Sequence, residues 1–402
     1  MRLTDDQRAF RDDLSGYLER EIDPVVDERD ANGPMSRAEL LGYLDDLRDL
    51  GVGFDPETAP EYFGDVWRFA IASEELSRVW PSLNVAIQMS FPALFVRFAS
   101  EHTREAHLPA LEAGECLGCL GVTEPSGGSD TARPRTTARR DGDEFVVDGA
   151  KTWVGNGGIA DVALVVAHDE ESGAQDMFLL DTEYDGFETE TLSKLGWKGV
   201  PNALMEFDGV RVPAENRFST MVSNAIREGN DMDDIVPFPP SVTQLFMEQK
   251  PLNATFSFMR TGMAFMAVGI MRAAFEEALD YTTERETFGS PIAGHQLVQR
   301  KLYEMNAGLE SSRGLARRAA EALEDGDSDA RRLSSLAKGY CCETAKEVTD
   351  EAIQVFGGEG LKTENRLERY YRDARVLTIP DGTTEIQQLV VGKELTGVSA
   401  YD

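Results

Sequence analysis

The sequence reads TEPSGGSD over residues 123–130 and IPDGTTEIQ over residues 379–387, and these two stretches decide how the rest of the chain is interpreted. The first is a turn with two glycines and with hydroxyl side chains at both ends. Glycines let a ligand approach the backbone closely, and the Ser129 hydroxyl can donate to a phosphate. The second places one carboxylate, that of Asp381, on a short turn before a C-terminal helix. We expect a cofactor-binding turn and a catalytic turn. The simpler alternatives are that the first is only a loop and that Asp381 only caps the helix.

Length and charge limit the class of protein. A chain of 402 residues can form two or three domains, and 41% hydrophobic residues exclude a disordered protein. The net charge of −32, without a basic stripe, argues against a nucleic-acid partner. Only 9 of the 40 basic residues are lysine, and the acidic residues are spread along the chain. This pattern predicts a cytosolic protein of a high-salt (halophilic) organism, the alternative being an acidic surface that docks a basic partner.

The cysteines predict core positions rather than a metal or redox site. Cys116 and Cys119 have C-x-x-C spacing, but they lie in an apolar, strand-like run with no second cysteine pair or histidine cluster nearby. The N-terminus opens a charged helix instead of a signal peptide, and we expect that no apolar run approaches membrane-spanning length. The sequence therefore predicts a soluble, cytoplasmic protein without a metal.

The pattern of apolar residues changes twice along the chain. Residues 1–115 predict a helical domain, in which Thr4 and Ser36 each begin a capping box and further helices cover 65–79 and 83–98. Residues 116–230 predict a small β domain, with strands at 144–148, 162–166 and 177–180, a hairpin turn at 141–143 and an end near 213. Residues 231–402 predict a helical domain with long helices over 256–275, 293–324, 328–356 and 384–395.

Further motifs follow the two turns in a fixed order. They are GAKTWVGNGG over 149–158, KLGWKG over 194–199, VRVPAEN over 210–216, the set Tyr281, Arg285, Phe288 and Gly289, and the set Gln354, Gly357, Gly358 and Gly360. In this order and spacing, from the first helix to Lys393, the chain resembles the acyl-CoA dehydrogenase family of flavoproteins. The resemblance implies an α+β multidomain fold: an N-terminal helical domain, a middle β domain and a C-terminal four-helix bundle.

The resemblance implies that the protein binds FAD. The residues that would contact the cofactor within one subunit are Val122, Thr123, Ser129, Trp153, Gly155, Thr383 and Glu385, with Trp153 against the isoalloxazine ring. The residues that would reach the FAD of a neighbouring subunit or its ADP portion are Arg285, Phe288, His295, Gln296, Gln354 and Gly358. A shared site of this kind implies a homo-oligomer, usually a tetramer in this family.

The resemblance also implies the reaction, which is conversion of an acyl-CoA to a 2-enoyl-CoA. Asp381 would remove the α-proton, its backbone N–H and a ribityl hydroxyl of FAD would stabilise the enolate, and the β-hydrogen would pass as hydride to flavin N5. Ser129, Arg260 and Lys393 would contact the substrate, and Arg260 would face the base and favour its ionised form. Electrons would pass to an electron-transfer flavoprotein.

Three departures from the family pattern concern the site. Asp381 stands where the family usually has glutamate, one methylene longer, and Met259 occupies the alternative position of the base in some relatives. Gly155 stands where a threonine hydroxyl usually binds flavin N5. An apparent insertion over 219–250 makes the chain about twenty residues longer than common relatives, and it either shapes the substrate entrance or is a surface excursion.

Two other functions fit the same residues. An aspartate base is also found in relatives that act on alicyclic acyl-CoAs and in nitroalkane oxidases, so a flavin oxidase acting on a non-CoA substrate is one alternative. A flavin-bearing scaffold with little turnover is the other. A Rossmann-type oxidoreductase is excluded because the chain has no strand–GxGxxG–helix unit.

Overall fold

The computed structural model describes residues 3–236, 238–248 and 251–400. Its N-terminal part is helical, with α1 (Asp5–Tyr17), α2 (Val26–Ala31), α3 (Arg37–Arg48), α4 (Ala59–Tyr62), α5 (Val66–Val79), α6 (Pro81–Gln88) and α7 (Glu101–Glu112). Both predicted capping boxes are present: the Thr4 and Ser36 side chains accept from the backbone N–H groups of Gln7 and Glu39. The first and third helices therefore begin where the sequence places them.

The single helix predicted over residues 83–98 is wrong. The chain instead ends α6 at Gln88 and forms a 3₁₀ helix, η2 (Phe91–Phe98). Pro92 has no N–H to donate, and its ring clashes with the carbonyl four residues earlier in an α-helix. The break turns the chain between Met89 and Ser90, beside the middle part of the molecule.

The middle part is a seven-stranded sheet with the order β1-β4-β2-β3-β7-β6, in which β5 pairs with β4. Its strands are β1 (Gly118–Gly121), β2 (Thr137–Asp141), β3 (Glu144–Val154), β4 (Val162–Asp169), β5 (Ala174–Asp181), β6 (Phe187–Thr191) and β7 (Ala203–Pro213). The predicted strands and the hairpin turn between β2 and β3 are confirmed, with Gly142 at φ +68°. Val147 lies opposite Val210 across β3 and β7, and both are buried in the core of the sheet.

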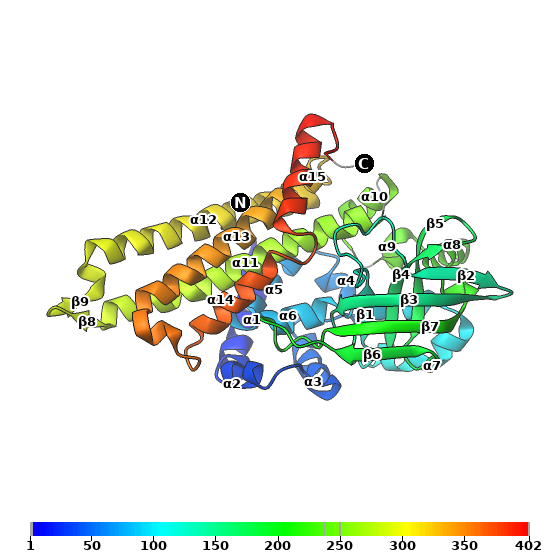
Figure 1. The fold of residues 1–402 in the computed structure, drawn as a ribbon, viewed down its shortest axis with the longest axis horizontal. Coiled ribbons are helices and arrows are strands. Elements are labelled where there is room, and N and C mark those ends of the chain that lie inside the picture. The colour runs from blue at the N-terminus through cyan, green and yellow to red at the C-terminus, as the bar shows by residue number, and fades with distance from the viewer. Residues whose placement is uncertain (1–2, 237, 249–250, 401–402) are drawn as a thin grey trace.

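The C-terminal part is a helical bundle that extends away from the sheet (Figure 1). It is preceded by α8 (Phe218–Arg227), α9 (Met232–Ile235) and α10 (Pro240–Glu248), and it contains α11 (Pro251–Glu284), α12 (Gln296–Glu324), α13 (Ala330–Phe356), α14 (Leu367–Leu377) and α15 (Thr384–Thr396). The short hairpin of β8 (Glu286–Thr287) and β9 (Ser290–Pro291) lies at the end of the bundle far from the sheet. The fold is thus the expected helical, β and helical-bundle arrangement.

Helix α11 corrects the expectation that no segment has membrane-spanning length. Its residues 253–284 are long and apolar enough to cross a membrane, but 89% of the most apolar window is buried inside the protein. This helix packs against α5, α12 and α13, and its buried apolar side chains belong to the main core. Its composition is that of a buried bundle helix.

Helix α14, which the sequence analysis does not predict, joins the three parts of the chain. Its Arg372 pairs with buried Asp30 of α2, and Asp30 also accepts from the indole N–H of Trp80 at 2.9 Å. The next residue, Asp373, accepts from the backbone N–H of Trp197 at 2.7 Å, in the loop between β6 and β7. Buried charges are tolerated when they are paired in this way, and α14 leads directly into the turn that carries Asp381.

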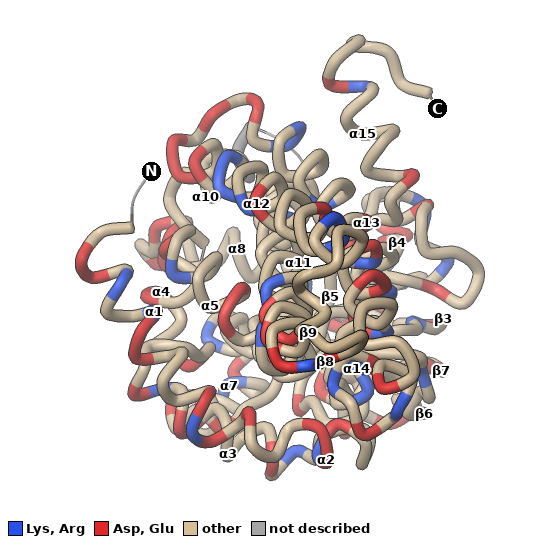
Figure 2. The backbone as a smooth tube through the Cα atoms, turned by 90° about the vertical axis from the view of Figure 1, so that its left-hand side faces the viewer, with Lys and Arg blue, Asp and Glu red and all other residues tan. Residues whose placement is uncertain are grey.

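In the view of Figure 2, Asp and Glu residues are spread over the helices and loops, with Lys and Arg residues between them. The four cysteines are free and buried, as the sequence predicts.

Candidate active site

The predicted catalytic turn connects α14 to α15. Asp381 adopts φ +54° and Gly382 φ +93°, so two consecutive residues lie in the left-handed region. The N-cap of α15 is Thr383, whose side chain accepts from the N–H of Ile386 at 3.4 Å. Asp381 is therefore not the cap of this helix, which removes the simpler interpretation of this aspartate.

Three side chains from three helices donate to the backbone of this turn. The Arg260 Nε of α11 donates to the Asp381 carbonyl at 2.9 Å. The Gln387 amide of α15 donates to the carbonyls of Asp381 and Gly382 at 2.9 and 2.8 Å. The Lys338 Nζ of α13 donates to the Gly382 carbonyl at 2.7 Å. A left-handed aspartate is costly, by about 1–3 kcal/mol, and persists where its surroundings hold it in this way.

The electrostatic surroundings of Asp381 are mixed. Burial raises the pKa of its carboxyl, while the positive charges of Lys338 and then Arg260 act in the opposite direction. A raised pKa makes a carboxylate a stronger base, and the two cations keep its ionised form accessible.

The second part of the site is the end of β3, which carries Trp153, together with the loop that follows it. Trp153 has φ +60° and its side chain is 57% exposed. The Asn156 side chain, itself on left-handed backbone, donates to the Ala86 carbonyl and to the Ser90 hydroxyl at 2.7 and 2.9 Å. This anchors the loop to the end of α6 and leaves the indole as a flat apolar wall that faces solvent.

Gly155 lies in this loop against the side chain of Met89. A Cβ atom added at Gly155 would lie 2.7 Å from Met89 Cγ. The Met89 side chain therefore occupies the space that a threonine side chain at position 155 would need.

A buried ion pair organises the predicted cofactor turn at residues 123–130. Glu124 accepts from Lys151 Nζ at 2.8 Å and from the backbone N–H groups of Arg135 and Thr136. Burial raises the pKa of Glu124, but Lys151 and these N–H groups outweigh it and lower the pKa to about 2. Val122 and Thr123 are partly buried, whereas Ser129 is exposed at the tip of the turn.

The residues predicted to reach a neighbouring subunit are not brought to Asp381. Arg285, Phe288 and Gln296 lie at or beside the β8–β9 hairpin, at the end of the bundle far from the sheet (Figure 1). Gln354 and Gly358, at the end of α13, are exposed, and the Phe288 ring is 99% exposed and lies 6.0 Å from the His295 ring. Within one chain, the predicted FAD residues thus form two separate groups.

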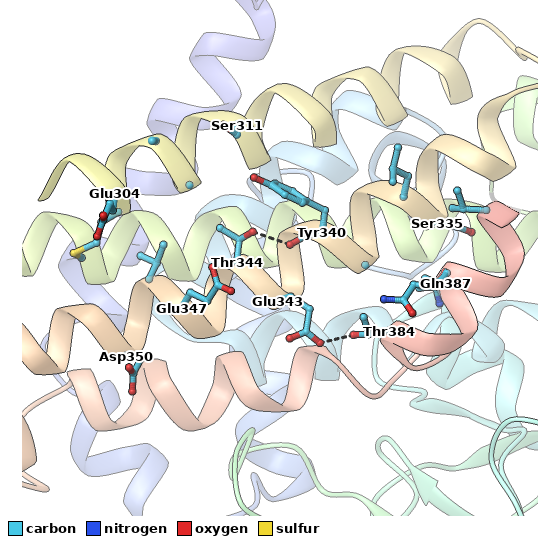
Figure 3. Close-up of a pocket in the computed structure, with 18 of the residues that line it drawn as sticks. Glu304, Ser311, Ser335, Tyr340, Glu343, Thr344, Glu347, Asp350, Thr384 and Gln387 are labelled. Atoms are coloured by element: carbon cyan, nitrogen blue, oxygen red, sulfur yellow. Dashed lines mark hydrogen bonds between the residues drawn. The ribbon is translucent and has the colours of Figure 1, made fainter. Parts of the chain in front are cut away.

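A groove of about 1060 Å³ runs between α12, α13 and α15 (Figure 3). Thr384 and Gln387, which follow the catalytic turn on α15, are among the residues that line it. The Thr384 hydroxyl donates to Glu343 at 2.6 Å. Asp381 is not among the residues that line it, so the groove is separate from the face of the turn that carries the carboxyl group.

Of the other predicted residues, Glu385 and Lys393 are exposed on α15. Met259, beside Arg260, is buried and apolar, so it provides no second base. Within the described ranges, no group of three His, Cys, Asp or Glu side chains could hold a metal ion.

The sequence analysis missed Lys338, Gln387 and Met89. A signal existed for Lys338, which is a lysine on a helix face otherwise formed by small and apolar residues. The contacts of Met89 and Gln387 depend on tertiary packing, and no local pattern in the sequence indicates them.

The segment over 219–250 is not a surface excursion. The side chains of Ile235, Val236, Phe238, Val242 and Leu245 are buried in the main core. Phe238 packs against Phe91 of η2 and Phe258 of α11, with ring centroids 6.0 and 5.1 Å apart. The segment thus joins the N-terminal helices to α11 near the residues that precede Arg260.

The comparisons with known proteins cover almost the whole chain. Three family models match in order: the acyl-CoA dehydrogenase N-terminal domain at residues 4–115, the middle domain at 119–210 and the C-terminal domain at 251–396. A cyclohex-1-ene-1-carbonyl-CoA dehydrogenase from Geobacter metallireducens is 33% identical over an alignment 405 positions long, which covers 98% of each chain. Residues 211–250, between the second and third matches, include the whole segment over 219–250.

Solved structures give the same result. The crystal structure of glutaryl-CoA dehydrogenase from Mycobacterium smegmatis superposes with a TM-score of 0.84 at 27% identity, over 100% of this chain and 97% of the other. A glutaryl-CoA dehydrogenase from the same organism in complex with FADH2 gives a TM-score of 0.79 at 25% identity, with the same coverage. The similarity therefore extends to a structure that contains the reduced flavin.

Proposed function

The chain belongs to the acyl-CoA dehydrogenase family and is an FAD-dependent oxidoreductase, and we propose that Asp381 is the base that removes the α-proton of its acyl-CoA substrate. The observation that carries this proposal is the environment of Asp381. Asp381 is half-buried, lies near two cations and is carried by a turn that three side chains hold in place. The only other family position for the base holds Met259, which cannot accept a proton.

The proposed step begins at the α-carbon of the thioester. The Asp381 carboxylate takes the α-proton, and the electron pair of the broken C–H bond is delocalised onto the thioester oxygen. The backbone N–H of Asp381 stabilises the negative charge on that oxygen, and the charge of Arg260 favours the ionised base. FAD, when bound, supplies the acceptor for the hydride that leaves the β-carbon.

The residues present fit a flavin cofactor. The Trp153 indole is half-exposed, and its backbone is left-handed. Its flat apolar surface suits one face of a heteroaromatic ring such as that of a flavin. We propose that Val122, Thr123, Ser129, Gly155, Thr383 and Glu385 complete this part of the site.

We also propose that the FAD site is shared between subunits of a homo-oligomer. Phe288, with its exposed ring, and Arg285 lie far from Trp153 and Asp381 in one chain (Figure 1). A second copy would bring its own hairpin and its Gln354 and Gly358 to the diphosphate and adenine of this chain's FAD. A tetramer is the assembly that we expect.

The substrate proposal is a 2,3-saturated acyl-CoA, with alicyclic acyl groups included. A relative named for a saturated alicyclic substrate, a cyclohexane-1-carbonyl-CoA dehydrogenase, is 31% identical, and an aspartate base suits a substrate whose ring places the α-hydrogen closer to the carboxylate. Ser129, Arg260 and Lys393 are the proposed substrate contacts, and an electron-transfer flavoprotein is the proposed electron acceptor. The net charge of −32 supports a location in the cytoplasm of a high-salt organism.

An anaerobic titration of the purified yellow protein tests the function. Straight-chain, branched and alicyclic acyl-CoAs are added in turn, with a nitroalkane as the competing substrate, and flavin absorbance is recorded. We expect at least one acyl-CoA to bleach the flavin and the nitroalkane to leave it oxidised. Bleaching by the nitroalkane alone, with rapid reoxidation in air, would establish an oxidase instead. No bleaching by any compound would support a flavin scaffold.

A further inference from the structure

Lys338, on helix α13, places its ammonium group in contact with the backbone of the catalytic turn. The Lys338 side chain is 0% exposed, and its helix neighbours Ala337, Cys341 and Cys342 are also buried. Its Nζ donates to the Gly382 carbonyl at 2.7 Å. A lysine is seldom fully buried unless its charge is used, because desolvation disfavours the charged form.

The contact made by Lys338 fixes the least favourable part of the turn. Asp381 is a non-glycine residue at φ +54°, and the following residue has φ +93°. Gln387 of α15 also donates to the Gly382 carbonyl, and Arg260 donates to the Asp381 carbonyl and to the Ser335 hydroxyl. Lys338 is the residue that ties the Gly382 carbonyl to α13.

The charge of Lys338 also acts on the carboxyl group of Asp381. The titratable groups that face this lysine come from the turn and from α11, α13 and α15, and they are Asp381, Arg260, Cys342, Glu343 and Glu385. Burial lowers the pKa of Lys338, and the negative charge of Asp381 is among the effects that oppose this change. For Asp381, burial raises the pKa, and Lys338 is the first of the two cations that lower it.

We propose that Lys338 is a positioning residue of the reaction: its buried ammonium fixes the catalytic turn through the Gly382 carbonyl and supplies the positive charge that a short aspartate base requires. This inference rests on the proposed role of Asp381. A turn held in this way fixes the backbone from which the short aspartate side chain extends.

The test uses an acyl-CoA in which sulfur replaces the β-carbon. Such a compound has no β-hydrogen to lose, so only the α-proton is removed, and the resulting enolate gives a long-wavelength charge-transfer band with oxidised flavin. The band is measured against pH in the FAD-loaded enzyme and in four variants. K338M removes the charge and the donor, K338Q removes the charge and keeps a donor, and K338R keeps the charge. Lys301→Met is the matched control, because Lys301 pairs with Glu351 and does not contact the turn.

We expect K338Q and K338M to raise the pH midpoint of the band by about one unit or more. At a fixed pH well below the midpoint, this shift corresponds to about a tenfold lower amount of enolate. K338R and K301M should keep the wild-type midpoint. A wild-type midpoint in K338Q, or loss of the band in K338R, would overturn the proposal. If K338M does not retain flavin, the midpoint of K338Q decides the result. D381N is measured in parallel. If D381N keeps the band, the assignment of the base fails; if D381N loses it while K338Q is unchanged, only the role of Lys338 fails.

Discussion

Met89 occupies the space in which a side chain at Gly155 would lie, with its Cγ 2.7 Å from the position of a Cβ atom. Gly155 belongs to the loop of Trp153, and Met89 is the first residue after α6. The two positions are therefore coupled: a side chain at 155 requires the Met89 side chain or the loop to shift.

The first prediction concerns this pair. G155T forces the Met89 side chain or the loop to move, and overpacking of this kind costs about 1–3 kcal/mol. We expect G155T to lower the thermal midpoint and the fraction of bound FAD, and the M89A/G155T double variant to recover both. Absorbance of bound flavin and a thermal melt measure the two effects. A G155T enzyme as stable as wild type, with full FAD content, would show that the loop adapts without cost.

The second prediction concerns Phe238, which packs on Phe63, Phe91 and Phe258. Removing a buried phenyl group leaves a cavity, and F238A should lose about 3–5 kcal/mol of stability. Urea unfolding measures this change. F218A is the control, because Phe218 lies outside this aromatic group and is only partly buried. Equal, small losses in both variants would mean that the segment over 219–250 does not belong to the core.

The third prediction concerns the ion pair of Glu124 and Lys151. E124Q or K151M leaves one buried charge without its partner, which costs about 3–5 kcal/mol, and the E124Q/K151M double variant should cost less than the sum of the two. Since the pKa of Glu124 is lowered to about 2 from 4.5, its stabilising effect is full above pH 4.5 and is lost as the pH falls toward 2.

Urea midpoints at pH 6 and pH 3 measure this dependence. Wild type should lose more stability between the two pH values than E124Q does. Additive single variants, or an equal loss in both proteins, would contradict the coupling.

The fourth prediction concerns the exposed Phe288 ring at the far end of the bundle. In a shared cofactor site, F288D places a carboxylate beside the FAD diphosphate of another subunit. We expect purified F288D to contain at least about tenfold less FAD and to dissociate more readily, as measured by flavin absorbance and light scattering. I226D, which changes an exposed apolar residue on α8, is the control. Full FAD content in F288D would contradict a shared site.

Local patterns predicted much of the fold. The capping residues Thr4 and Ser36, the hairpin turn at Gly142 and the apolar length of α11 each depend on neighbours in sequence, and the helices and strands that they indicate are present. Helix α14 was missed because its buried face includes Arg372, whose burial depends on Asp30, more than 300 residues away.

The candidate site was predictable only in part for the same reason. The motif around Asp381 identifies a turn, but neither its left-handed backbone nor the donors Arg260 and Lys338 can be read from residues 379–387. These contacts arise when α11, α13 and α15 pack together.

The most direct test of the central claim is single-turnover flavin reduction in D381N. The variant is mixed anaerobically with the acyl-CoA that bleaches the wild-type flavin fastest, and the rate of bleaching is measured at saturating substrate. Because a positioned general base contributes about 10²–10⁴-fold, D381N should bind FAD normally and bleach at least about 100-fold more slowly. Bleaching of flavin-loaded D381N within about threefold of the wild-type rate would show that Asp381 is not the base.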